Sequence, residues 1–260
     1  IIELEKIYRQ KDEAFVRILN GIRNRSIDEA MFTQLNTRVQ PDFEPPPKDP
    51  YIHLVTTNAK AEEINIRELN KLSGKKYKFT GELSGEFDQK TLPAPQVLEL
   101  KVESQVMLTN NDREHRWVNG TVGRVTKIEL TDVGDVIWVR LETGETVDVY
   151  HYRWDMFRFM YNQVSQRIDT ETTGSYSQYP LILAWALTIH KSQGKTFEKL
   201  IVDMDRGAFA HGQTYVALSR GTTLAGLVLK KPIEKKHLLL DWRVVKFLTQ
   251  FQYAKSEIAL

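Results

Sequence analysis

LAWALTIHKSQGKTFEKLIVD, residues 183–203, passes from an apolar run into a polar loop and back into an apolar run. The first run covers residues 181–187 without a charged side chain, which predicts a strand buried on both faces. Residues 199–203 predict a second strand. Strands of this kind are typical of parallel α/β sheets, in which ligands bind at the carboxyl ends of the strands. We therefore predict an α/β domain whose loop at residues 188–197 binds a ligand.

The loop combines hydroxyls, an amide, a cation and a glycine, which suits contacts to phosphates and sugars. Its Gly194-Lys195-Thr196 ending is similar to the end of a phosphate-binding loop of the form G-x-x-x-x-G-K-[ST]. The position of the first glycine, however, is occupied by Ile189. Without that glycine the backbone cradle for phosphates cannot form, so the loop is not predicted to grip ATP. A plain polar turn between a strand and a helix remains an alternative.

The sequence upstream continues the α/β pattern. Residues 51–57 predict a strand, and Asn58 is a good N-cap for the helix that follows. Residues 12–24 have apolar side chains at helical spacing and predict an amphipathic helix. Ser26, with Glu29 three residues later, indicates a capping box that begins another short helix.

The sequence downstream adds a helix at residues 212–220 and a final strand at 226–229. Arg220 ends an otherwise apolar helical turn. An arginine in this position is usually a structural salt-bridge partner. It can also be a finger that reaches the γ-phosphate of a nucleotide across a domain interface.

Between the α/β segments the pattern changes to short alternating strands separated by turn residues, over residues 97–150. This pattern predicts a small antiparallel β-barrel inserted into the α/β domain. The expected boundaries are 1–96 for the first part of the α/β domain, 97–178 for the barrel and 179–260 for the second part.

Two residues of the predicted barrel, Arg116 and Trp117, are candidates for contact with nucleic acid. Aromatic rings and guanidinium planes both stack on bases without sequence preference. Core packing is an equally good explanation for Trp117, and a turn alone explains Asn119-Gly120.

Composition excludes several classes of function. The 260 residues include no cysteine, which excludes disulfides, cysteine-ligated zinc and thiol catalysis. The six histidines lack metal-ligand spacing, so no metal site is predicted. The net charge of +2 does not by itself indicate nucleic acid. No apolar run approaches the roughly 20 residues of a membrane span, and because the chain begins with Ile1 we expect a further segment upstream.

These segments together resemble the Pif/RecD-type family of superfamily 1 DNA helicases, over nearly the whole chain. Thr196, where many superfamily 1 helicases have glutamate, favours the Pif branch over RecD. The segments that carry the resemblance are LAWALTIHKSQGKTFEKLIVD (183–203, fifth motif), GQTYVALSRGTTLAGL (212–227, sixth motif), KIYRQKDEAFVRILNGIR (6–23, fourth motif), LVTTNAKAEEIN (54–65, T-x-N segment) and QVMLTNNDREHRWVNGTVGRV (105–125, the start of a Src-homology-like barrel).

The resemblance implies a RecA-like domain, a P-loop NTPase fold that lacks its own P-loop, with the barrel as its insertion. It implies that Arg9 and Arg220 are the catalytic arginines that contact the γ-phosphate of ATP, and that Gln193 and Gly194 approach the nucleotide. It also implies a set of residues that hold the backbone of single-stranded DNA: Thr56, Asn58, Thr188, His190, Lys191 and Ser192.

The resemblance further implies an ATP-dependent helicase that travels 5′ to 3′ on DNA and acts in repair, recombination, replication and telomere maintenance. ATP and Mg²⁺ would be held mainly by an N-terminal RecA-like domain, which supplies the P-loop, so this chain alone is expected to be inactive. The expected partners are that domain, single-stranded DNA and fork-like DNA, without membrane association, and we expect a monomer. The expected location is the cytoplasm or nucleoid of a bacterium, or the nucleus or mitochondrion of a eukaryote.

Two other functions stay open from the sequence. The chain could be the helicase half of a conjugative relaxase or a RecD-like nuclease subunit, against which Thr196 argues. It could also be a non-enzymatic module that binds single-stranded DNA. That module would bind DNA in a salt-dependent manner without any role for Arg9 or Arg220.

Overall fold

The computed structural model describes residues 9–10, 12–47, 49–132, 134–163, 166–205, 207–208, 210–239, 241–244 and 246–247. The chain divides into two compact units. The first unit comprises residues 1–62 and 186–260, and the second comprises residues 63–185. The sequence-based boundaries at 96/97 and 178/179 both fall inside the second unit and stay predictions.

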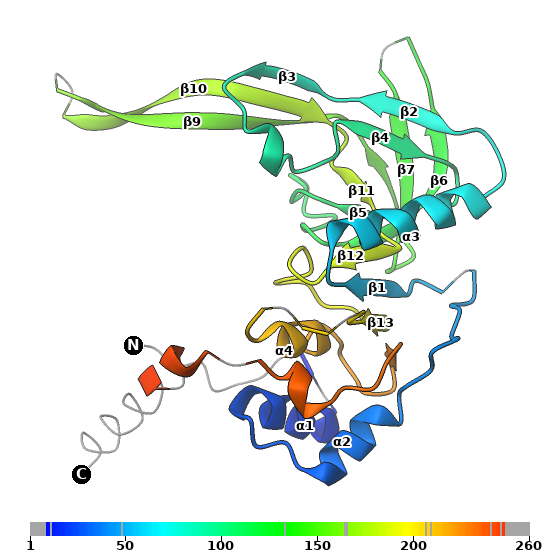
Figure 1. Ribbon diagram of the computed structural model, residues 1–260. Helices are drawn as coiled ribbons and strands as arrows, with labels where there is room; N and C mark the ends of the chain where they lie inside the picture. The colour runs from blue at the N-terminus through cyan, green and yellow to red at the C-terminus, as the bar shows by residue number, and fades with distance from the viewer. Residues whose placement is uncertain are drawn as a thin grey trace. The chain divides into compact units, whose positions relative to one another are not determined.

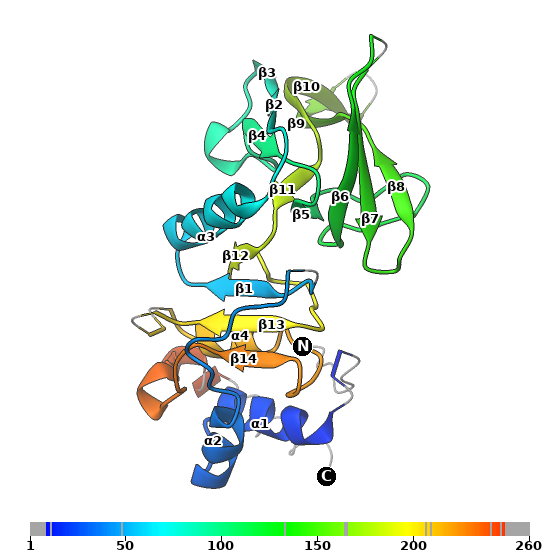
Figure 2. The ribbon, with the colours of Figure 1, turned by 90° about the vertical axis from the view of Figure 1, so that its right-hand side faces the viewer.

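The first unit is built on a parallel four-stranded sheet in the order β12-β1-β13-β14. Leu54 at the centre of β1 pairs with Leu187 of β12 on one side and with Val202 of β13 on the other. Figure 2 shows the four strands one above another. The predicted parallel α/β sheet is thereby confirmed. The strands are β1 (Ile52–Val55), β12 (Ala186–Thr188), β13 (Leu200–Asp203) and β14 (Leu227–Leu229).

The two longer helices wholly within the first unit, α1 and α2, begin at aspartate caps. The amphipathic helix predicted for residues 12–24 is α1 (Glu13–Asn24), where the Asp12 carboxylate accepts from the Phe15 amide at 3.1 Å. For α2 (Glu29–Asn36) the predicted cap, Ser26, is wrong. Asp28 directly precedes the first helical residue, and its carboxylate accepts from the Met31 amide at 2.7 Å. Two short elements complete the unit, α4 (Gln213–Leu218) and the 3₁₀ turn η2 (Lys235–His237).

The helix that follows β1 is α3 (Asn58–Lys71), which crosses from the first unit into the second. Its first turn is capped by Thr57, whose hydroxyl accepts from the Lys60 amide at 3.3 Å. Asn58 is the first helical residue and is exposed, so the predicted N-cap at Asn58 is wrong. Capping therefore does not explain Asn58.

The apolar run at residues 181–187, predicted as one strand, is two strands in two different sheets. Leu181–Leu183 forms β11, which pairs antiparallel with β5 of the second unit, and only the later residues join the parallel sheet as β12. The break lies at Ala184, whose amide donates to the Gln105 carbonyl at 2.9 Å while its carbonyl accepts from the Gln105 side-chain amide at 2.9 Å.

The second unit contains a five-stranded antiparallel sheet in the order β11-β5-β6-β7-β8. Four of its strands, β5 to β8, lie within the stretch 97–150 for which short antiparallel strands are predicted, whereas β11 comes from the run predicted as a single strand. Closure of the sheet into a barrel stays a prediction. A hydrophobic core that includes Trp117, Tyr179 and Leu181 packs between the strands of this unit. The bounds of these strands are β5 (Gln105–Leu108), β6 (Val122–Glu129), β7 (Val136–Leu141) and β8 (Thr146–Val149). The smaller elements are β2 (Tyr77–Thr80), paired with β4 (Val97–Leu100), and the 3₁₀ turn η1 (Gln89–Thr91).

A third sheet of the second unit, in the order β3-β10-β9, has no counterpart among the predicted elements. It consists of β3 (Glu82–Gly85), β9 (Tyr152–Asn162) and β10 (Arg167–Gln178). In Figure 1 the β9–β10 hairpin extends well beyond the end of β3. Where the structure describes helices, none is long and apolar enough to cross a membrane.

Candidate functional site

The loop that follows β12 is folded as a series of overlapping turns. The amides of Ser192, Gln193 and Lys195 donate to the carbonyls of Thr188, His190 and Ser192, all at 3.0–3.1 Å. Gly194 has φ +80°, a left-handed backbone conformation that favours glycine. The loop is therefore a braced platform with a fixed shape.

The predicted DNA contacts on this loop fall into two groups. His190 and Lys191 are exposed, as are the predicted nucleotide contacts Gln193 and Gly194. Thr188 and Ser192 are buried, and their hydroxyls are used within the loop. The Ser192 hydroxyl donates to a carbonyl at 2.7 Å, and that of Thr188 accepts from the Lys191 amide at 3.3 Å. In this conformation the two buried residues shape the loop.

The end of β1 lies beside this loop, as expected for neighbouring parallel strands. Val55 is paired with Thr188, and its carbonyl accepts from the Ile189 amide at 3.0 Å. Thr56 is buried directly after β1, and Asn58 is exposed at the start of α3. The structure thus brings the two predicted DNA-contacting segments of the first unit to one edge of its sheet.

Arg9 and Arg220 both donate hydrogen bonds to Ser219, Arg9 to its carbonyl and Arg220 to its hydroxyl. Arg9 donates from Nη1 to the Ser219 carbonyl at 3.1 Å and from Nε to the Thr196 hydroxyl at 2.8 Å. Arg220 donates from Nη2 to the Ser219 hydroxyl at 2.9 Å and from Nη1 to the Lys195 carbonyl at 3.3 Å. Its Nε donates to a helical carbonyl of α4 at 2.9 Å. Both guanidinium groups are held by neutral acceptors.

The two arginines at this position have no carboxylate partner among the described residues. Desolvation, followed by the charge of Arg9, lowers the pKa of Arg220 to about 10. Burial likewise lowers the pKa of Lys195. Within the described ranges neither Arg9 nor Arg220 forms an ion pair with a carboxylate. A bound anion would therefore stabilise this cluster electrostatically.

Sequence reasoning did not identify Thr196 or Ser219 as partners of the two arginines. Each is a hydroxyl residue in a motif that was singled out, and Ser219 directly precedes Arg220. The position of Ser219 next to Arg220 was the signal that could have identified it. Arg9 and Thr196 are 187 residues apart, so the sequence gives no indication of their contact.

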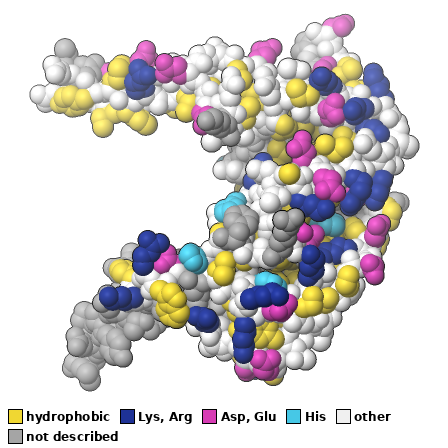
Figure 3. Space-filling view, viewed as in Figure 1, with side chains coloured by type: hydrophobic (Ala, Val, Ile, Leu, Met, Phe, Trp, Pro, Cys, Tyr) yellow, Lys and Arg dark blue, Asp and Glu magenta, His cyan; other side chains and the backbone are white. Residues whose placement is uncertain are grey.

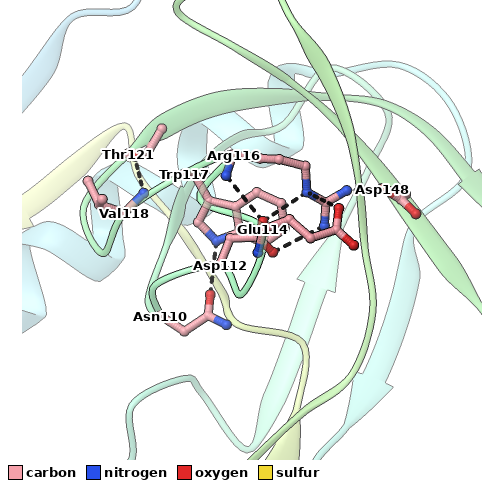
Figure 4. A network of polar contacts seen from close by, with 8 residues as sticks. All are labelled: Asn110, Asp112, Glu114, Arg116, Trp117, Val118, Thr121 and Asp148. Atoms are coloured by element: carbon pink, nitrogen blue, oxygen red, sulfur yellow. Dashed lines mark hydrogen bonds and ion pairs between the residues drawn. The ribbon is translucent and has the colours of Figure 1, made fainter.

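Arg116 and Trp117 of the second unit, the other predicted DNA contacts, are engaged within their own unit (Figure 4). Arg116 donates from Nε at 2.9 Å and from Nη2 at 3.1 Å to the Asp112 carboxylate, and from Nη1 to Asp148. Trp117 is 6% exposed, with its indole N–H bonded to Asn110 at 3.0 Å and its ring 4.7 Å from the Arg116 guanidinium carbon. This geometry favours the core-packing alternative for Trp117 and a bracing role for Arg116.

In the part of the chain that is described, no group of three or more His, Asp or Glu side chains is arranged to hold a metal ion. The positively charged cluster around Arg220 is likewise unsuited to a cation.

Fold and site together define a parallel α/β domain that presents a braced polar loop and, beside it, two arginines bound by neutral acceptors in the described part of the chain. No protein-family model matches the chain. Curated relatives do: the chain is 32% identical over 249 residues to the ATP-dependent DNA helicase Pif1 of Bdellovibrio bacteriovorus, covering 94% of this chain and 53% of that protein. It is 33% identical over 267 residues to human ATP-dependent DNA helicase PIF1, covering 98% of this chain and 38% of the human protein.

Solved structures agree with these relatives. A crystal structure of Pif1 helicase from Bacteroides in complex with ADP-AlF3 and ssDNA matches with a TM-score of 0.72 and 33% identity, covering 97% of this chain and 57% of that one. The chain is therefore homologous to the Pif1 helicases, and it spans about half the length, or less, of the curated relatives it matches.

Proposed function

We propose that this chain is the second, C-terminal motor half of an ATP-dependent DNA helicase that moves 5′ to 3′. In this role it supplies two arginines to the γ-phosphate of ATP and part of the track for single-stranded DNA. Relatives described as ATP-dependent DNA helicases, and a Bacteroides neighbour with ADP-AlF3 and ssDNA, support the proposal.

The observation that carries the proposal is the Arg9–Ser219–Arg220 arrangement. Both guanidinium groups bond to Ser219, their acceptors are neutral, and the pKa of Arg220 is lowered. This arrangement favours the binding of an anion of high charge, such as a γ-phosphate. A finger arginine acts by stabilising charge that develops during phosphoryl transfer. Gln193 and Gly194, exposed on the same loop as Thr196, are suited to sense the nucleotide.

The DNA track on the first unit runs along the loop after β12 and the end of β1. Lys191 supplies a cation for phosphates, and the exposed His190 and Asn58 supply hydrogen-bonding groups. Thr56, Thr188 and Ser192 act chiefly by holding this edge in shape. Backbone contacts of this kind fix position on the strand without reading sequence.

The remaining parts follow from the same proposal. The sheet that contains β5–β8 closes into a Src-homology-like barrel inserted in a RecA-like domain. ATP and Mg²⁺ are held mainly by an N-terminal RecA-like domain, because this chain has Ile189 where a P-loop would have its first glycine. The motor works as a monomer on fork-like DNA, in whichever compartment holds that DNA.

The test is the DNA-stimulated ATPase activity of this chain mixed with the separately prepared first motor domain of a Pif1 relative. Arg220→Ala should lower turnover by about 1,000-fold. Arg220→Lys should also be strongly impaired, because lysine cannot form the forked contact. Arg17→Ala, on an exposed position of α1, is the matched control and should leave turnover unchanged.

Complex formation between the two halves is measured first by sedimentation, so that a failure to dock is recognised. If the halves associate and turnover does not depend on Arg220, the chain is not a finger-bearing motor half. DNA binding that persists in that case supports the non-enzymatic binding module instead.

A further inference from the structure

The outer part of the β9–β10 hairpin is a two-stranded ribbon with no third strand beside it. β3 pairs with β10 only over residues 174–177, whereas the β9–β10 pairing continues out to Asn162 and Arg167. All of residues 167–172 are exposed. Isolated two-stranded ribbons are marginally stable in water, so this long extension calls for a function.

The two faces of the outer ribbon differ in chemistry, because directly opposed residues of antiparallel strands share a face. One face carries the pairs Phe157–Thr172, Phe159–Thr170 and Tyr161–Ile168. The other carries Arg158–Glu171 and Met160–Asp169. Figure 3 shows hydrophobic side chains gathered along one side of this arm and charged side chains along the other. The first set of three pairs is called here the aromatic face.

The side chains of the aromatic face are strongly exposed. Phe157 is 55%, Phe159 72%, Tyr161 63% and Ile168 69% exposed. Isolated exposed apolar residues are ordinary, but a continuous row on one face marks an interaction surface.

The aromatic face is not an extension of the core of the second unit. Strand alternation puts Arg153 and Asp155 on the same side of β9 as Phe157. The core side at the base of the hairpin carries Trp154, stacked on the fully buried Tyr176. Along β9 the solvent side is therefore polar near the base and becomes aromatic toward the tip.

The composition of the aromatic face fits a ligand that both stacks and accepts hydrogen bonds. Its three aromatic residues alternate along β9, which spaces them about 6.6–6.8 Å apart. Aromatic side chains presented by a sheet in this way are platforms for the bases of single-stranded nucleic acid. Two of the three pairs place a threonine hydroxyl beside the ring, at Thr170 and Thr172. A dry apolar partner would leave those hydroxyls without hydrogen bonds.

The charge distribution of the ribbon leaves the aromatic face without a carboxylate. Its carboxylates, Asp169 and Glu171, lie on the opposite face, as does Arg158. Phosphates that follow bases stacked on the aromatic face would therefore not meet like charge there.

We propose that the aromatic face of the β9–β10 hairpin binds unpaired single-stranded nucleic acid by stacking bases on Phe157, Phe159 and Tyr161. This inference rests on the proposed function, in which the chain tracks single-stranded DNA. Because the aromatic face carries no cation, its contribution adds affinity without adding to the salt dependence of binding.

The experiment measures binding of the 260-residue chain to a fluorescent oligothymidylate of about 16 nucleotides by anisotropy, over a range of salt. An abasic oligomer of the same length and charge is the companion probe. Phe159→Ala should weaken binding to the oligothymidylate about fivefold or more, with an unchanged salt slope and unchanged binding to the abasic oligomer. Phe159→Trp should bind as well as the native chain.

Met160→Ala, at an exposed position on the opposite face, is the matched control and should bind normally. Circular dichroism confirms that each variant is folded. Normal oligothymidylate binding by folded Phe159→Ala would overturn the inference. A concentration-dependent dimer that the same substitution abolishes would also overturn it, by assigning the face to a second copy of the chain. Arg220→Ala should keep the Phe159-dependent binding, so failure of the motor proposal and failure of this one are distinguishable.

Discussion

Replacement of Arg116 by methionine should destabilise the second unit while leaving its affinity for single-stranded DNA unchanged. Arg116 holds Asp112 with two hydrogen bonds and Asp148 with a third, and its guanidinium lies over the Trp117 ring. These contacts join the loop after β5 to β8. Methionine retains much of the length of the side chain but none of its donors.

The size of the effect follows from the exposure of the partners. The side chain of Asp112 is 8% exposed and that of Arg116 26%. A charge-assisted hydrogen bond contributes about 1.5–3 kcal/mol. Breaking a fully buried pair costs about 3–5 kcal/mol, but Asp112 keeps two backbone amide donors, at Glu114 and Arg116, in the variant. We therefore expect a loss of about 2–3 kcal/mol, which lowers Tm by about 4–12 °C.

The pH dependence gives an independent check of this pair. The hydrogen bond from Arg116 is the largest cause that lowers the pKa of Asp112 in the folded chain. A carboxylate with a lowered pKa stabilises the fold above its unfolded pKa, about 3.9, and this contribution is lost as pH falls through the folded pKa. The stability difference between the native chain and Arg116→Met should therefore be largest near neutral pH and shrink in acid.

The assay is urea unfolding followed by circular dichroism at several pH values, with DNA binding measured at a temperature where both proteins are folded. Arg153→Met is the control, because its pair with Asp155 is exposed and should contribute about 1 kcal/mol or less. The reasoning is refuted if Arg116→Met unfolds like the control, or if it weakens DNA binding without a loss of stability. The second result would restore Arg116 as a DNA contact.

Three further substitutions test other contacts. Asp12→Ala should cost about 1–2 kcal/mol in urea unfolding at neutral pH, because it removes the cap of α1. The backbone hydrogen bonds from Leu224 and then Phe15 lower the Asp12 pKa, so this difference should disappear as pH falls through that pKa. Gly226→Ala should lower Tm, since a Cβ at this position would lie 2.0 Å from the Glu198 carbonyl oxygen; an unchanged melting curve contradicts this. Thr196→Val should slow ATP turnover of the reconstituted motor by removing the hydroxyl that holds Arg9, and Thr196→Ser should restore it.

The parallel sheet could be predicted from sequence because its strands are short apolar runs between clear polar turns. Residues 199–203 and 51–57 are such runs, and both form strands of that sheet. The division of residues 181–187 could not be predicted, because an apolar run does not reveal which neighbours its backbone will bond. Gln105, distant in sequence, takes both backbone groups of Ala184 and ends one strand there.

The β9–β10 hairpin escaped prediction for a different reason. Along β9 the large apolar side chains move from one face of the strand to the other. Trp154 lies on the buried face near the base, whereas Phe157 and Phe159 lie on the opposite, exposed face farther out. A period-two pattern assumes one buried face along the whole strand. For the candidate site, the motifs around Arg220 could be identified from sequence. The bond between Arg9 and Thr196 could not, because only the tertiary fold brings these residues together.

The interruption of the first unit by the second favours one order of folding over another. The pairing of β1 with β12 joins Val55 to Thr188 across everything between them, so the parallel sheet must close a loop that contains residues 63–185. For an unstructured loop of that length the entropic cost is about 4 kcal/mol. The second unit is contiguous, and its described strands pair only with one another. It can therefore fold first, which brings residues 63 and 185 together before β1 pairs with β12. Refolding should then show a fast phase for the second unit and a slower one for the parallel sheet.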